Sequence, residues 1–255
     1  MTFDKLSPLS LYVHIPFCRS KCGYCDFNSY GGLEELIPTY IDALSNELRM
    51  RALGNRQSVA TIYFGGGTPS LLDTTHIRQV IDTCRNFFKI EKNVEITLEA
   101  NPGTITYQWL ASLRSLGFNR LSLGFQSLDD KELRLLGRIH SANQAVEAYS
   151  WARQAGFENI NIDLIYGLPY QSFGQWQEIL NRTLRLAPEH FSLYPLTLDE
   201  TTPLGHAVES GSIPAPDPDV AAEMYQYAEE CLAGAGYEHY ELSNWSLPGN
   251  ACRHN

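Results

Sequence analysis

Three cysteines lie close together near the start of the chain, in the segment Cys18-Arg-Ser-Lys-Cys22-Gly-Tyr-Cys25. Thiolates are soft ligands that suit iron and sulfide, and a 4Fe-4S cluster is usually held by four of them. Because this segment supplies three, one iron of such a cluster would be left without a protein ligand. The spacing therefore predicts a 4Fe-4S cluster whose open iron binds a small molecule.

The loop that carries these cysteines can wrap one metal centre. Gly23 gives the backbone freedom for a tight wrap, and Pro16 stiffens the approach from the preceding apolar run. A zinc knuckle is the alternative, but structural zinc usually takes two separated ligand pairs, and no second pair stands near these sulfurs in the sequence. His14 is either a fourth ligand or a hydrogen-bonded core histidine.

Other residues able to bind a ligand follow apolar runs. Glycines at Gly65–Gly67, followed by Thr68, let the backbone approach a ligand closely. Glu99 ends an apolar run, and an ammonium group on a ligand would satisfy its carboxylate. Asp163 has a similar setting and suits ribose hydroxyls. A tight turn and structural ion pairs are the alternatives.

Two more places have residue types suited to binding. Gln126 ends an apolar run, and Arg138 follows a short helix, where it suits a carboxylate or is simply solvated. At the end of the chain, Cys252 and His254 form a second pair able to bind metal, and both residue types serve as axial ligands of heme iron. We expect the native protein to continue beyond Asn255.

Strands alternating with helices must position these residues. Apolar, β-branched runs predict strands at residues 10–15, 60–64, 94–100, 120–125, 159–167 and 190–196. Helical spacing predicts helices at residues 33–53, 71–88, 106–116, 141–155, 172–186 and 219–234. A further strand is expected near residues 237–245. Six βα units imply a parallel sheet, open or curved, and polar residues after the strands favour a barrel.

Composition predicts one large α/β domain, because 255 residues of which 44% are hydrophobic can bury a full core. A net charge of −10 with scattered basic residues argues against a nucleic-acid partner. We see no apolar run of the roughly 18 residues that a transmembrane segment needs, and no signal peptide. The six cysteines, three of them clustered, indicate metal ligands in a reducing compartment, so we expect a cytoplasmic protein.

Several motifs in the same order resemble the radical S-adenosylmethionine proteins of the coproporphyrinogen dehydrogenase-like group. They are the cysteine motif after YVHIPF, then GGGTPS, LEANPG, LSLGFQS with LGRIH, and NIDLIYGLP. Within this group the chain is most similar to the HemW heme chaperones, because Phe27 stands where the oxygen-independent coproporphyrinogen III dehydrogenases carry another cysteine. The segments YELSNW and PGNACRHN also resemble HemW, in which His254 and Asn255 would open an HNxxYW heme segment.

This resemblance implies a partial (β/α)6 TIM-like barrel over residues 1–200. Residues 201–255 would then form a connection, a helix and a strand that lead to a C-terminal domain. The resemblance also implies a 4Fe-4S cluster on Cys18, Cys22 and Cys25, with the amino and carboxylate groups of S-adenosylmethionine on the open iron. The positions that match the cofactor contacts of the group are Tyr12, Tyr24, Gly66, Gly67, Thr68, Glu99, Gln126, Arg138 and Asp163.

The function implied by the resemblance is a chaperone that binds heme and passes it to acceptor proteins, respiratory ones included. His254 and Asn255 would lie at the heme, and the protein would form a homodimer. The alternative is an oxygen-independent coproporphyrinogen III dehydrogenase, which decarboxylates propionates by radical chemistry. Both readings include the cluster and S-adenosylmethionine, and they differ in whether a tetrapyrrole is turned over.

Overall fold

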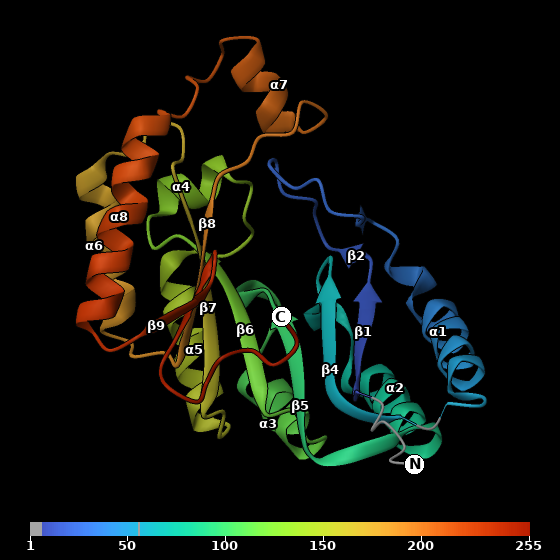
Figure 1. Ribbon diagram of the computed structural model, residues 1–255. Helices are drawn as coiled ribbons and strands as arrows, with labels where there is room; N and C mark the ends of the chain where they lie inside the picture. Colours follow the sequence, from blue (N-terminus) through green and yellow to red (C-terminus); the bar gives the residue numbers. More distant parts are fainter. Residues whose placement is uncertain (1–6, 56) are drawn as a thin grey trace.

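The computed structural model describes residues 7–55 and 57–255, and its centre is one eight-stranded sheet in the order β1-β4-β5-β6-β7-β8-β10-β9. The first six strands in this order run parallel. They are β1 (Leu9–Ile15), β4 (Ser58–Gly66), β5 (Lys89–Ala100), β6 (Arg120–Gln126), β7 (Asn159–Tyr166) and β8 (His190–Pro195). Figure 1 shows that the sheet curves and that helices cover its convex face. The predicted βα units and the barrel-like curvature are confirmed.

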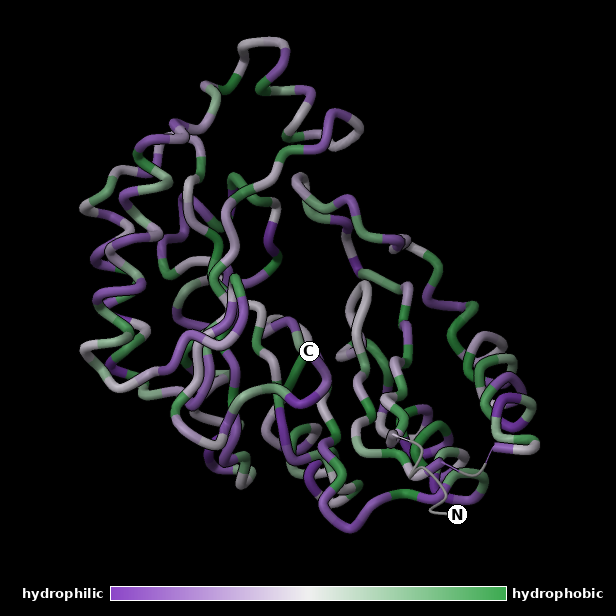
Figure 2. Tube along the Cα trace, viewed as in Figure 1, coloured by the Kyte–Doolittle hydropathy of each residue, from purple (hydrophilic) through white to green (hydrophobic). Residues whose placement is uncertain are grey.

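Helices follow these strands where the apolar spacing predicted them. They are α1 (Ile37–Ala52), α2 (Thr74–Phe87), α3 (Tyr107–Ser115), α4 (Asp130–Leu135), α5 (Ala142–Gln154) and α6 (Phe173–Leu184). Asp73 accepts hydrogen bonds from two backbone N–H groups where α2 begins, and Ser141 and Ser172 form capping boxes at α5 and α6. Figure 2 shows hydrophilic and hydrophobic residues alternating along the helices, as expected when one face packs on the sheet.

Short elements complete the connections between these units. They are the 3-10 turns η1 (Glu34–Leu36), η2 (Pro69–Leu71) and η3 (Pro102–Thr104), and the paired strands β2 (Phe17–Cys18) and β3 (Tyr30–Gly31). None of the helices in residues 7–55 and 57–255 combines the length and the apolar composition that crossing a membrane requires.

The chain after residue 200 adds to the same sheet. It forms α7 (Pro203–Glu209), α8 (Pro218–Gly234), β9 (Glu238–Glu241) and β10 (Asn244–Ser246). β10 pairs antiparallel with both β8 and β9, and Trp176 of α6 donates a hydrogen bond to the Met224 carbonyl of α8. The division of the chain at residue 200 stays a prediction.

The single strand expected near residues 237–245 is instead a two-stranded hairpin. The carboxylate of Glu241 accepts hydrogen bonds from the Ser243 N–H and from the side chain of Asn244, and these bonds close a turn inside the run. Helix α7 was not predicted either, because it lies in a stretch expected to be a connection. Thr202 caps this helix by accepting a hydrogen bond from Gly205, and Pro203 suits its first turn.

The two faces of the curved sheet differ in chemistry. Apolar side chains such as Phe64, Leu98 and Leu123 are fully buried and belong to the hydrophobic core. Successive side chains of a strand point to opposite faces, so the residues between them face the concave side. Many of these are polar, namely Thr61, Tyr63, Glu95, Thr97, Glu99, Arg120, Ser122, Asn161, Asp163, His190 and Ser192.

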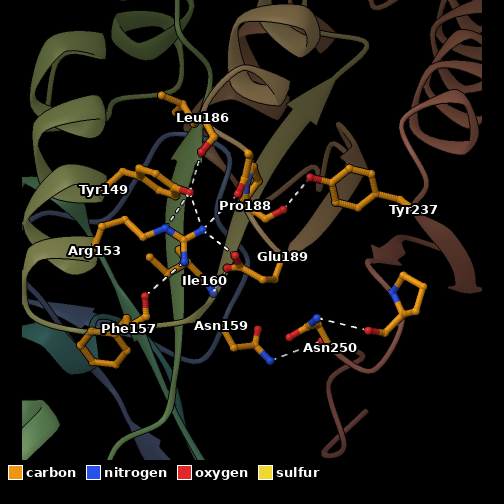
Figure 3. A network of polar contacts seen from close by, with 12 residues as sticks. Tyr149, Arg153, Phe157, Asn159, Ile160, Leu186, Pro188, Glu189, Tyr237 and Asn250 are labelled. Carbon is orange, nitrogen blue, oxygen red and sulfur yellow. Dashed lines mark hydrogen bonds and ion pairs between the residues drawn. The ribbon is translucent and has the colours of Figure 1, made fainter.

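A polar network ties together the N-terminal ends of β7 and β8 (Figure 3). The Arg153 guanidinium of α5 lies 2.8 Å from a Glu189 carboxylate oxygen, and the other oxygen of Glu189 accepts a hydrogen bond from the Ile160 N–H. Arg153 also donates to the Phe157 carbonyl, at 3.1 Å. In a parallel sheet this end lies opposite the C-terminal strand ends, which carry the cysteine loop.

Candidate functional site

The loop with the three cysteines leaves the C-terminal end of β1 and is held through its backbone. The Tyr30 N–H donates to the Pro16 carbonyl, the Gly23 N–H donates to the Leu136 carbonyl, and the Leu204 N–H donates to the Gly23 carbonyl. Cys18, Cys22 and Cys25 form no disulfide; the first is buried and the other two are partly exposed. The main chain therefore fixes the loop and leaves its thiols available for a ligand.

The structure places three predicted residues against these sulfurs. Thr68 Oγ1 lies 3.4 Å from the sulfur of Cys18, and Arg138 Nη1 lies 3.6 Å from that of Cys22. A Cβ atom added to Gly67 would stand 3.0 Å from the Cys18 sulfur and 2.8 Å from the Phe17 carbonyl oxygen. Because only glycine fits this approach, the glycine-rich loop and the cysteine loop form one unit.

The cysteine loop fits a cluster in its donor chemistry. Within residues 7–55 and 57–255, no three His, Cys, Asp or Glu side chains converge as a site for one metal ion. A 4Fe-4S cluster does not require that convergence, since each thiolate binds a different iron. Burial raises the pKa of the Cys25 thiol, and a bound metal would offset this because metal ligation favours the thiolate.

His14 helps to hold the cysteine loop, and both of its ring nitrogens have partners other than the sulfurs. Its Nε2 lies 2.9 Å from the Asn28 carbonyl oxygen, and its Nδ1 lies 3.5 Å from the Tyr12 hydroxyl. A Cβ atom on Gly66 would come within 2.6 Å of the imidazole ring. The reading of His14 as a hydrogen-bonded histidine is the one that these contacts support.

Glu99 lies beside the glycine-rich loop with two hydrogen bonds to its carboxylate. One oxygen accepts from the Tyr63 hydroxyl at 2.8 Å, and the other accepts from the Gly66 N–H at 3.1 Å. A Cβ atom on Gly65 would touch both the Glu99 carboxylate and the Tyr12 ring, so these two side chains flank the glycine. Burial raises the pKa of Glu99 to about 7, and the bond from Tyr63 lowers it in part. A ligand cation would complete this site.

Gln126 and Arg138 meet over the backbone of β6. A Cβ atom on Gly124 would stand 2.9 Å from the Gln126 amide nitrogen and 3.2 Å from Arg138 Nη2. Gln126 has a φ of 66°, a left-handed conformation that is uncommon for a residue other than glycine. Arg138 donates to the Gly124 carbonyl, while its buried Nε has no hydrogen-bond partner in the described part of the chain. The Arg138 guanidinium therefore lies between the cysteine loop and β6.

Asp163 and Tyr24 occupy different surroundings on the same side of the sheet. The Asp163 carboxylate accepts hydrogen bonds from Asn161, at 2.6 Å, and from Ser122, at 3.1 Å, and burial raises its pKa. The Tyr24 ring packs against the apolar cluster that contains Leu136 and Ile165, and burial raises the pKa of its hydroxyl strongly. Asp163 is a polar ligand candidate, whereas Tyr24 anchors the cysteine loop.

The end of the chain folds back onto the concave face of the sheet. Figure 1 shows the C-terminus inside the curve. His254 Nδ1 lies 2.8 Å from Thr61 Oγ1, and the ring stacks on Tyr63 with centroids 4.9 Å apart. Asn255 donates to the Tyr240 hydroxyl at 3.2 Å. The His254 ring also lies 6.1 Å from the ring of Tyr12, so one predicted heme residue neighbours one predicted cofactor residue.

Several polar residues of the concave face had not been predicted from the sequence. Tyr63 bonds Glu99, and Asn161 bonds both Asp163 and His190. Burial raises the pKa of Tyr194, and the charge of Asp163 raises it further. The signal for these residues was the alternation of polar side chains along each strand, which the apolar runs concealed.

The curved parallel sheet, the cysteine loop and the glycine-rich loop define a class of protein, and comparison with known families agrees. Residues 12–183 match the model of the Radical SAM superfamily, and the chain belongs to that superfamily.

Curated relatives and a solved structure are similar over almost the whole chain. The "Heme chaperone HemW" of Escherichia coli (strain K12) is 39% identical, covering 98% of this chain and 66% of its own length. The mitochondrial "Radical S-adenosyl methionine domain-containing protein 1" of Mus musculus is 42% identical, covering 96% of this chain and 56% of its own. The coproporphyrinogen III oxidase HemN of Escherichia coli, described as a radical SAM enzyme, superimposes with a TM-score of 0.87 at 32% identity, covering 95% of this chain and 56% of that one. The chain thus spans between 56% and 66% of the length of these proteins.

Proposed function

We propose that this chain is the cofactor-binding part of a cytoplasmic heme chaperone, which binds heme and passes it to acceptor proteins. The observation that carries this proposal is the similarity to HemW chaperones over almost the whole chain. Phe27 supports it as well, since its side chain is 64% exposed on the cysteine loop at the position where the dehydrogenases of the group carry a further cysteine. A homodimer and respiratory heme acceptors belong to the same proposal.

Cys18, Cys22 and Cys25 would hold a 4Fe-4S cluster. When bound, the cluster supplies an open iron that takes the amino and carboxylate groups of S-adenosylmethionine. The chain would orient that cofactor with charged groups, because the Glu99 carboxylate suits the N–H donors of the iron-bound amino group and the Arg138 guanidinium suits a carboxylate. Gln126, next to Arg138, would contact the same end of the cofactor.

The rest of the cofactor would lie along the polar concave face. The Asp163 carboxylate would accept hydrogen bonds from ribose hydroxyls. Gly66, Gly67 and Thr68 would line the approach, and Tyr12 would cover it beside Glu99.

His254 and Asn255 would contribute to heme binding. Burial lowers the pKa of His254, which keeps the imidazole neutral and able to ligate a metal at neutral pH. Its Nδ1 is held by Thr61, an arrangement that often orients a ligating histidine through its second nitrogen.

A second candidate function is oxygen-independent coproporphyrinogen III dehydrogenase activity. The superposition on HemN favours it. The two readings separate in an anaerobic assay of the full-length protein with reductant, S-adenosylmethionine and coproporphyrinogen III. We expect no protoporphyrinogen IX, and we expect heme to be retained and then passed to an apo acceptor protein. Formation of protoporphyrinogen IX would reject the chaperone reading.

A further inference from the structure

The C-terminal segment, defined here as residues 250–255, reaches both carboxylates of the proposed S-adenosylmethionine site through side chains. One connection passes through β4 to Glu99, and the other passes through β9, β8 and β7 to Asp163. The two connections share no residue other than those of the segment itself.

The first connection begins at His254. Its ring lies against Tyr63 with centroids 4.9 Å apart and an interplanar angle of 24°, and its Nδ1 is 2.8 Å from Thr61 Oγ1. The Tyr63 hydroxyl donates to the Glu99 carboxylate at 2.8 Å. The stack restrains the plane of the tyrosine ring, and because a phenol O–H bond prefers to lie in the ring plane, the stack favours the direction in which the hydroxyl donates to Glu99.

The second connection has a defined direction. The Asn161 amide nitrogen donates to Asp163 at 2.6 Å and to Ser122 at 2.7 Å, so its oxygen is the acceptor that faces His190 Nδ1 at 2.6 Å. The hydrogen-bond network thus assigns the proton of His190 to Nδ1, and burial keeps the ring neutral by lowering its pKa to about 2.

Because the His190 ring is neutral, the Tyr240 hydroxyl must be the donor in the hydrogen bond between them. His190 Nε2 has a lone pair and lies 2.7 Å from the Tyr240 hydroxyl, which must donate to it. The tyrosine oxygen is left to accept from the Cys252 N–H and the Asn255 amide, each at 3.2 Å. The hydrogen bonds from residue 252 through Tyr240, His190 and Asn161 thus have consistent directions, and this series holds Asp163 as an acceptor.

We propose that the C-terminal segment forms the floor of the S-adenosylmethionine pocket and that Tyr63 and His190 are positioning residues for Glu99 and Asp163. This inference rests on the proposed cofactor site. Coupling between two sites is reciprocal, so cofactor binding must in turn order the segment that carries His254. The segment that contacts heme would therefore respond to whether S-adenosylmethionine is bound.

The test uses full-length protein reconstituted anaerobically with its cluster. Tyr63→Phe and Tyr240→Phe each delete one hydroxyl, one from each connection, and keep the ring. We expect each to weaken S-adenosylmethionine binding on the order of tenfold in equilibrium dialysis, since each removes a hydrogen bond that orients a charged group. Tyr225→Phe is the matched control, because its hydroxyl donates to the Leu242 carbonyl outside both connections; its affinity should stay at the wild-type value.

Amide hydrogen exchange supplies a readout that a merely structural role would not move. S-adenosylmethionine should slow exchange at Cys252 in the wild-type protein and at Arg253, whose N–H donates to Glu95. Both Tyr→Phe variants should lose most of that slowing at Arg253, whose acceptor Glu95 is unchanged in each of them. Wild-type affinity and wild-type slowing in both variants would overturn the inference.

The outcomes separate this inference from the proposed function. If wild-type protein with a full cluster does not bind S-adenosylmethionine, the proposed cofactor site is wrong. If the wild-type protein binds it and both hydroxyl deletions are neutral, only the coupling is wrong. Because Tyr240 is partly exposed, its variant tests the coupling even if the Tyr63 variant melts early.

Discussion

The two irregular segments that contain cysteine are held in opposite ways. Backbone hydrogen bonds fix residues 18–25, and the three thiols there form no disulfide. Side chains fix residues 250–255: the Cys252 thiol lies 3.6 Å from a Glu95 oxygen, and His254 is bonded to Thr61. Because backbone hydrogen bonds hold the cysteine loop, its side chains remain available for a ligand. The position of residues 250–255 depends instead on the groups that their side chains contact.

The largest expected effect separates the two segments by their cysteines. Replacing Cys18, Cys22 and Cys25 together with alanine should remove all iron and labile sulfide from anaerobically purified protein, and S-adenosylmethionine binding with them. Cys252→Ala should keep the full cluster and lower the free energy of unfolding by about 1–2 kcal/mol, because a buried side chain is truncated. Loss of iron in the Cys252 variant would break the comparison.

The next effect tests the carboxylate between the two segments. Glu99→Gln should weaken S-adenosylmethionine binding on the order of a hundredfold, because it removes the charged acceptor for the amino group of the cofactor. In the wild-type protein, affinity should fall as the pH drops below about 7, where Glu99 takes up a proton. Tyr12, Tyr63, Arg120, Asp163 and Tyr194 are the other titratable groups that interact with this carboxylate.

The folding stability of the protein should change with pH in the direction opposite to its cofactor affinity. The folded-state pKa of Glu99 is raised, so the folded protein binds a proton more tightly than the unfolded chain does, and the charged carboxylate lowers stability as the pH rises from about 4.5 to 7. Glu99→Gln should therefore raise the melting temperature of cofactor-free protein at pH 8 and change it little at pH 4. An equal effect at both values would contradict the assigned burial.

A smaller effect tests how closely the backbone of the glycine-rich loop approaches the cysteine loop. Gly67→Ala should cost about 1–3 kcal/mol of folding free energy and lower cluster occupancy, since the added Cβ meets the Phe17 carbonyl at 2.8 Å. Gly174→Ala is the matched control, because this glycine lies in α6 with open space around it. Denaturant titration should show the control equal to or more stable than the wild-type protein.

The smallest effect lies at the N-terminal ends of β7 and β8, opposite the strand ends that carry the cysteine loop. Arg153→Met should lower the free energy of unfolding by about 1 kcal/mol, because it removes partly exposed hydrogen bonds to Glu189 and Phe157. Affinity for S-adenosylmethionine should not change. A weaker affinity would show that the N-terminal ends of β7 and β8 also influence the cofactor site.

The sequence alone predicted the elements and the cysteine loop well, because both depend on local signals. Apolar runs of strand length, helical spacing and glycine stops are read within a few residues, and the six βα units are confirmed. The proposed cluster ligands Cys18, Cys22 and Cys25 likewise lie in one short loop. The residues Gly67, Thr68 and Arg138 were predicted as cofactor contacts, and the structure places them beside the cysteines of that loop.

Only the tertiary structure decided the neighbours of the carboxylates and the place of the C-terminal segment. Glu99 meets Tyr63 from a different strand, and Thr61 meets His254 from the far end of the chain. No local pattern specifies such pairs, because they arise when six curved parallel strands turn their polar side chains toward one concave face and the last residues fold back onto it. The sequence determined which reactive groups the chain contains, and the curvature of the sheet determined which of these groups lie side by side.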